Sequence, residues 1–164
     1  MAYDIYDASI PPLIHMLGGL SNILAKGEAH GGIDPAEARL APDMLPLKAQ
    51  VYIATDTAKG CGARLAGVEI PKYEDTETTF PELKARVAKT IAFLKSLDRK
   101  AFASSETKEI VLKFPSVTFE FSGADYVGKF VLPNAYFHIT TAYGILRNTG
   151  VALGKGDYLS GDKA

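Results

Sequence analysis

The chain has 164 residues, a net charge of −1 and a composition that is 47% hydrophobic. A chain of this size forms one domain with a sizeable core, here residues 1–164, and its apolar content excludes a disordered protein. Its nearly balanced charge provides no field to attract a polyanion, so nucleic acid is not expected as a partner.

The first predicted helix carries apolar side chains at alternating steps of three and four over residues 10–24. This spacing places them on one helical face. Asp7 or Ser9 is the expected N-cap. Because proline lacks an N–H group, Pro11–Pro12 either occupy the first turn or interrupt a helix that begins near Asp4.

The same spacing predicts a second helix over residues 44–65 and a third over residues 80–94. Asp43 is the expected N-cap of the second helix, and Gly67 ends it. Thr79, followed by a proline in the first turn, caps the third. The charged side chains of the third helix that are expected to face solvent are Lys84, Arg86, Lys89 and Lys95.

A different pattern separates the third helix from the last one. Residues 109–114 and 117–121 are rich in β-branched and aromatic side chains, and Pro115 and Ser116 between them form a turn signal. We expect a short β-hairpin here. Since a two-stranded ribbon is marginally stable alone, it should pack against the helices.

The fourth predicted helix spans roughly residues 124–149 and ends at Gly150. Four amphipathic helices of this length can bury their apolar faces against one another. The sequence therefore predicts an all-α fold, a four-helix bundle with a short β-hairpin inserted before the last long helix.

Three consecutive positions on the apolar face of the last helix are polar, namely Asn134, His138 and Thr141. Buried polar groups destabilise a fold unless they are hydrogen-bonded, so an inward cluster implies a satisfied network, a water-filled pocket or a ligand. In the alternative, another stripe is buried and His138 turns toward a groove or a subunit interface. That alternative stripe consists of Phe130, Phe137 and Gly144.

The sequence also bears on the cellular compartment. Cys61 is the only cysteine, so no internal disulfide can form, which suits a reducing environment. Residues 1–7 contain two acids and no basic group, unlike a signal peptide. Because no uninterrupted apolar run approaches about 18 residues, no membrane-spanning helix is expected. We expect a cytoplasmic protein without a membrane partner.

Several segments together resemble one family. The run 132–151, the tail segments 153–155 and 157–159, and the front segments 3–11 and 43–47 are similar to the DUF1993 family of unknown function. That family is grouped with the DinB/YfiT-like metalloenzyme superfamily. The resemblance covers nearly the whole chain and implies a four-helix bundle that is commonly a homodimer.

The resemblance further implies where a metal would bind. Many members of the superfamily hold a divalent ion with three histidines, two of them four residues apart on the last long helix and one on the second helix. The corresponding positions are Asn134 and His138, with Gln50 nearest on the second helix. His138 is therefore the one candidate metal ligand, and the triad is incomplete. Zinc and nickel favour imidazole, thiolate or carboxylate, and an amide is a weak ligand.

Three functions follow as hypotheses. The first is a protein that binds a small molecule in a polar pocket between bundle helices, without a catalytic metal. The second is a degenerate or noncanonical metalloenzyme, such as a thiol-dependent transferase, with zinc or nickel at His138. The third is a homodimeric structural or interaction module. No residue is assigned as catalytic. The candidate pocket residues are Asn134, His138, Thr141, Gln50, Tyr136 and Tyr143.

Overall fold

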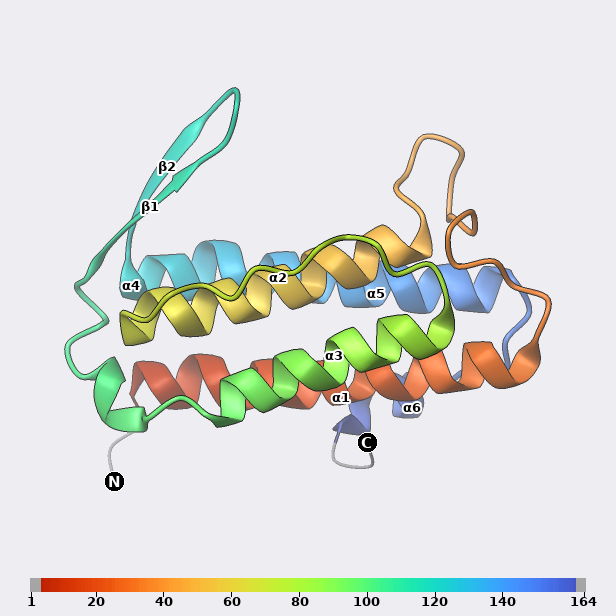
Figure 1. Cartoon of the computed structure of the whole chain (residues 1–164), viewed down its shortest axis with the longest axis horizontal. Helices are drawn as coiled ribbons and strands as arrows, with labels where there is room; N and C mark the ends of the chain where they lie inside the picture. Colours follow the sequence, from red (N-terminus) through yellow and green to blue (C-terminus); the bar gives the residue numbers. More distant parts are fainter. Residues whose placement is uncertain (1–3, 162–164) are drawn as a thin grey trace.

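Four long helices lie side by side in the computed structural model, which describes residues 4–161 (Figure 1). Helix α1 runs beside α3, and α2 runs beside α5, so the bundle has two pairs that bury the core between them (Figure 1). The predicted all-α bundle with a hairpin is confirmed. Tyr3, at the start of the front segment of the family resemblance, lies outside the described residues. The long helices are α1 (Ile5–His30), α2 (Leu47–Ala66), α3 (Phe80–Lys95) and α5 (Leu132–Asn148).

Helix α1 begins earlier than either expected cap would allow. The carboxylate of Asp4 accepts a hydrogen bond from the backbone N–H of Asp7 at 3.1 Å. The Asp7 carboxylate in turn accepts one from the backbone N–H of Asp4, so the two residues form a capping box. Caps at Asp7 or Ser9 were wrong, since Ser9 lies inside the helix and donates its hydroxyl to the carbonyl of Ile5. The prolines Pro11–Pro12 are thus internal, as in the second alternative.

Helix α2 begins three residues later than its apolar spacing predicted. The expected start at Met44 with Asp43 as cap was wrong, because the helix starts at Leu47 and Pro46 occupies the cap position. A proline ring disfavours helical conformation in the residue before it, which keeps the preceding segment out of the helix. The predicted end is confirmed: Gly67 adopts a left-handed conformation with φ of 72°.

Helix α1 is also the most apolar helix of the bundle. It has 26 residues, and by length and composition alone it could cross a membrane, with a mean hydropathy of 1.2 in its most apolar window. In the fold, 56% of that window is buried within the bundle. These side chains therefore form one wall of the protein core. They include Ile10, Leu13, Leu17, Leu20, Ile23 and Leu24.

The predicted hairpin is present and projects from one end of the bundle (Figure 1). Strands β1 (Glu109–Lys113) and β2 (Thr118–Ser122) pair antiparallel. The side chains of Ile110 and Leu112 are buried, whereas β2 is largely exposed. One strand thus fastens the hairpin, and the other faces solvent.

The last long helix contains an irregularity that its apolar spacing did not reveal. A short turn, α4 (Gly123–Asp125), leads into the π-helical turns η2 (Tyr126–Val131), where the N–H of Leu132 donates to the carbonyl of Val127 five residues earlier. Pro133 follows at once. In an α-helix its ring would collide with the carbonyl four residues before it, so the wider turn relieves that clash.

Two short helices complete the fold. The 3₁₀ turn η1 (Arg99–Phe102) follows α3, and α6 (Lys155–Leu159) packs across α1. The approach of α6 requires a glycine below it, because a Cβ at Gly19 would lie 2.2 Å from the carbonyl oxygen of Tyr158. The tail of the chain is therefore seated closely on α1.

Candidate functional site

The polar positions of α5 face α2. His138 and Thr141 are buried, with 9% and 7% of their surface exposed, and Asn134 is half-buried. Phe137, a member of the alternative stripe, is 56% exposed. The first sequence interpretation therefore describes the orientation of α5, because its apolar and polar inward residues share the face that meets α2.

Gln50 on α2 fixes the orientation of the buried imidazole. Its amide nitrogen donates to the carbonyl of Leu45 at 2.9 Å, which leaves its amide oxygen pointing at Nδ1 of His138, 2.7 Å away. An amide oxygen only accepts hydrogen bonds, so Nδ1 must carry the proton. The neutral imidazole is thereby held as the Nδ1–H tautomer.

The other ring nitrogen, Nε2 of His138, is then an unprotonated acceptor. It forms no hydrogen bond with any residue in the range 4–161. Within that range the Tyr73 hydroxyl is the one buried side-chain nitrogen or oxygen without a partner, so Nε2 is reached by solvent. Burial lowers the pKa of His138 below its ordinary value of 6.5, so the ring is neutral at pH 7.

The remaining candidate residues differ in their surroundings. Asn134 donates its amide to the hydroxyl of Thr57 on α2 at 2.8 Å, so it joins the same helix interface. The hydroxyl of Thr141 donates back to a carbonyl of its own helix at 2.7 Å. Tyr136 lies at the surface with 36% exposure, and Tyr143 packs its ring edge-on against α6. The structure thus joins Gln50 to His138 and Asn134 to Thr57 along the α2–α5 interface, and places both tyrosines elsewhere on α5.

These residues do not form a suitable donor set for a metal ion. The interface offers one imidazole and two amides, from His138, Gln50 and Asn134, and both amides are engaged in hydrogen bonds. No group of three or more His, Cys, Asp or Glu side chains in residues 4–161 could hold a metal. Because zinc and nickel favour imidazole, thiolate and carboxylate ligands, this constellation does not fit a divalent ion.

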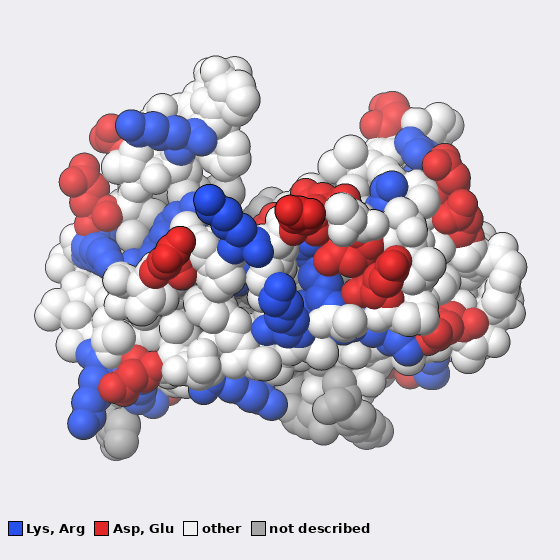
Figure 2. Space-filling model, viewed as in Figure 1, with Lys and Arg blue, Asp and Glu red and all other residues white. Residues whose placement is uncertain are grey.

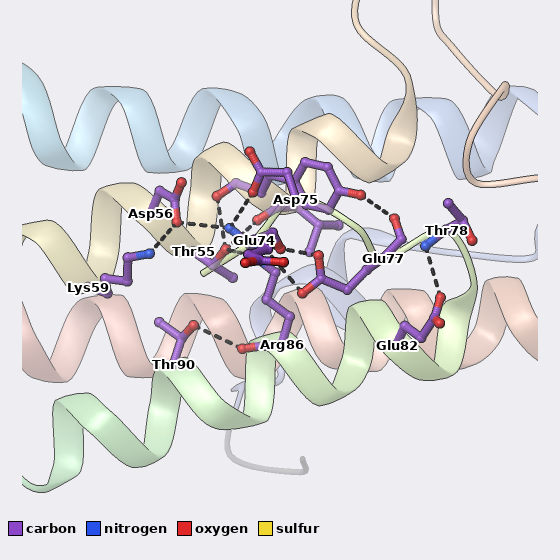
Figure 3. A network of polar contacts seen from close by, with 12 residues as sticks. Thr55, Asp56, Lys59, Glu74, Asp75, Glu77, Thr78, Glu82, Arg86 and Thr90 are labelled. Carbon is purple, nitrogen blue, oxygen red and sulfur yellow. Dashed lines mark hydrogen bonds and ion pairs between the residues drawn. The ribbon is translucent and has the colours of Figure 1, made fainter. Parts of the chain in front are cut away.

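A second polar cluster lies on the opposite side of α2, around Arg86 of α3 (Figure 3). The expectation that Arg86 faces solvent was wrong, because its side chain is 1% exposed. The segment 67–79 runs along α2 (Figure 1), and its residues Glu74, Asp75 and Glu77 contact the guanidinium. Each of the five guanidinium N–H groups has a neighbouring acceptor. These acceptors are the Thr55 hydroxyl at 2.8 Å, the Glu74 carbonyl at 3.1 Å, and carboxylates of Asp56 at 2.9 Å, Asp75 at 3.0 Å and Glu77 at 3.1 Å.

Aromatic rings and a second cation complete this cluster. The guanidinium of Arg86 lies 4.7 Å from the ring centre of Tyr52 and 5.2 Å from that of Tyr73. Lys59, which is buried, pairs with Asp56 at 2.8 Å. Acidic and basic side chains accordingly crowd together over this part of the surface (Figure 2). The cluster fastens the segment 67–79 to α2 and α3.

A signal for this cluster was present in the sequence. Arg86 follows Leu83, a residue of the apolar face of this helix, by three positions. The arginine therefore lies at the edge of the apolar face and not on the opposite side of the helix. The acids at 74, 75 and 77 precede the helix within a short connection. Spacing alone did not reveal that this connection folds back over the arginine.

Comparison with solved structures defines the class of protein first. The fold matches the crystal structure of a DinB family member protein from Shewanella denitrificans, with a TM-score of 0.82 and 39% sequence identity over 94% of this chain and 90% of that chain. The chain belongs to the family described as Domain of unknown function (DUF1993), which matches residues 5–159. Among curated proteins, none matches this chain.

Proposed function

We propose that the protein binds a small molecule at the interface of α2 and α5, with Nε2 of His138 as the hydrogen-bond acceptor. The observation that carries this proposal is the fixed tautomer. Gln50 orders the ring and uses its only proton, while Nε2 is left unpaired and accessible. An ordered, unpaired acceptor binds a donor group without the cost of first arranging the side chain.

The surroundings of His138 indicate the kind of ligand. The exposed ring of Phe137 lies edge-on to the imidazole, with 5.1 Å between ring centres. Leu45, whose carbonyl orients Gln50, is 52% exposed. A neutral ring beside apolar side chains favours an uncharged molecule that combines an apolar body with one O–H or N–H group.

Phenol is a suitable probe, and toluene is its counterpart without a donor. In a ¹⁵N-detected titration, phenol should move the Nε2 resonance of His138 in a saturable way, and toluene should leave it in place. The variant His138→Phe should abolish phenol binding, whereas His30→Gln, which changes an exposed histidine at the end of α1, should preserve it. A proton found on Nε2, or phenol binding that survives His138→Phe, would contradict the proposal.

A separate observation supports a second function, self-association through the hairpin. Three apolar side chains at its tip are exposed: Phe114 by 46%, Val117 by 43% and Phe119 by 40%. The tip also lacks charged side chains (Figure 2). We propose that two copies pair these tips about a twofold axis, because a self-complementary apolar patch produces an isologous dimer.

Light scattering tests this association directly. The chain should form a dimer at micromolar concentration, and Phe119→Lys should yield a monomer. The matched variant Glu120→Lys, at the neighbouring exposed position of β2, should remain a dimer. A wild-type chain that is monomeric throughout the micromolar range would contradict the proposed dimer without affecting the His138 site.

A further inference from the structure

A cavity of about 430 Å³ lies at the end of the bundle, between the first turns of α1 and the π-helical turns η2. It is separate from the His138 site, because no residue of α2 lines it and His138 is not among its lining residues. The apolar side chains of its lining are those of Ile5, Ala8, Ala124, Val127 and Leu132. Its volume falls in the range of sites that hold small ligands.

The backbone of η2 contributes to the shape of this cavity. Gly128 lines it, and a Cβ added there would meet no atom within 4 Å, so this position faces open space. The widened turn places Val127 and Leu132 around that space, linked by their backbone hydrogen bond. π-Helical turns inside α-helices are frequent at functional sites because they reposition side chains in this manner.

Two carboxylates border the cavity, and they differ in their partners. Asp4 caps α1 and accepts from the guanidinium of Arg99 at 2.8 Å. The backbone N–H of Asp7 and this arginine hold the pKa of Asp4 below its usual value, so it stays ionised. The carboxylate of Glu106, by contrast, has no hydrogen bond or ion pair with any residue of the described range.

Although Glu106 is exposed, its backbone is firmly held. Its carbonyl accepts the N–H of Ala124 at 2.9 Å, and the hydroxyl of the preceding Ser105 donates to the carbonyl of Leu65 at 2.8 Å. The contact with the next element is tight, since a Cβ at Gly123 would lie 1.7 Å from the Ser105 carbonyl oxygen. The base of this side chain is therefore positioned in advance at the rim.

Within residues 4–161, the charged groups at and beside the rim sum to a negative value. Arg99 is shared between Asp4 and Asp7, which leaves one negative charge in that group, and Glu106 adds another. The nearby cation Lys129 is paired with Asp125 at 2.9 Å. An apolar cavity with an unpaired anion at its entrance complements a ligand with an apolar body and a positive end.

We propose that this cavity binds a small organic cation, an aliphatic amine whose hydrocarbon chain lies against Val127 and Leu132 and whose ammonium group pairs with Glu106. The hydrocarbon gains by leaving water, and the ammonium keeps contact with solvent at the rim. No covalent step is involved.

Hexylammonium tests this proposal against hexanol, which has the same chain without the charge. By titration calorimetry, the wild-type protein should bind hexylammonium more tightly than hexanol. In ¹⁵N–¹H spectra the affected amides should include Ala8 and Gly128. The variant Glu106→Gln should weaken hexylammonium binding by about fivefold and leave hexanol unchanged, as expected for one partly solvated charge pair.

Two further variants make the result decisive. Glu120→Gln removes an exposed carboxylate from β2 that does not line the cavity, and should leave hexylammonium affinity unchanged. Gly128→Leu fills the cavity and should abolish binding of both probes while the protein remains folded by circular dichroism. Equal affinity for amine and alcohol, equal effects of Glu106→Gln and Glu120→Gln, or binding that survives Gly128→Leu would each overturn the proposal.

Discussion

The two polar clusters that flank α2 differ in how completely their groups are paired. Around Arg86, all five N–H groups meet acceptors contributed by α2 and the segment 67–79. In the Gln50–His138 pair, one ring nitrogen is paired and the other is not. A fully paired cluster holds structural elements together, whereas a partly paired one retains capacity for a ligand.

The clusters also differ in charge. Arg86 is surrounded by carboxylates that compensate for its removal from water, as a buried charge requires. His138 has no such partner, and burial alone lowers its pKa. The first group remains a cation in the folded protein, and the second is neutral at pH 7. Their substitution should therefore affect different properties.

The largest effect should come from Arg86→Met. The variant keeps much of the side-chain volume but leaves the hydroxyl of Thr55 and the neighbouring carboxylates without their shared donor. We expect a loss of about 3 kcal/mol in the free energy of unfolding, measured by urea denaturation. The segment 67–79 should also become sensitive to proteolysis under native conditions.

Lys84→Met provides the matched control for that substitution. Lys84 lies on the same helix and contacts Glu28, but both side chains are partly exposed. A surface pair of this kind contributes about 0–1 kcal/mol. Equal losses for the Arg86 and Lys84 variants would show that the Arg86 cluster does not fasten the connection.

Helical spacing was sufficient to predict the bundle, but not what covers it. The apolar spacing located all four long helices, and the cap at Thr79 was correct because a capping box is a local motif. The burial of Arg86 was missed because it depends on a connection that folds back from twelve to nine residues earlier, at Glu74 and Glu77. Such a contact has no periodic signal.

The candidate site was partly predictable for the same reason. Spacing placed Asn134 and His138 on one helical face, and the resemblance indicated Gln50 as their neighbour on the second helix. The tautomer could not be predicted, because it depends on the carbonyl of Leu45, and Leu45 lies outside the helix that the sequence predicted to contain it. The reason is Pro46, which delays the start of α2 to Leu47. The carbonyl of Leu45 therefore lies outside the helix and can accept the amide of Gln50.

Substitution of Gln50 should have the next largest effect. Which property of His138 changes, its tautomer or its pKa, depends on the replacement. Gln50→Leu removes the acceptor from the Nδ1–H group, which should cost about 1–2 kcal/mol and transfer the proton to Nε2. Gln50→Glu places a carboxylate beside the ring and should raise the pKa of His138. Imidazole ¹⁵N shifts measure both changes. An unchanged tautomer in Gln50→Leu would contradict the role given to Gln50.

A smaller effect should appear as a pH dependence of stability. Because burial lowers the pKa of His138 below 6.5, the unfolded chain binds more protons than the folded chain between the two pKa values. Stability should therefore rise with pH up to about 6.5 and then level off. The difference between wild type and His138→Gln isolates this contribution, since the other two histidines are common to both. Parallel profiles would contradict the burial effect.

The smallest effects should rank the three carboxylates around Arg86 by exposure. The side chain of Glu77 is 20% exposed, that of Asp56 44% and that of Asp75 55%. Water competes most strongly for the outermost group, so Asp75→Asn should cost less than about 0.5 kcal/mol and Glu77→Gln should cost more, with Asp56→Asn between them. Thermal unfolding of the three isosteric variants measures this order. If Asp75→Asn were the most damaging, the most exposed carboxylate would contribute most to compensating the charge of Arg86. The two clusters would then differ in charge, and not in how deeply their compensating groups are buried.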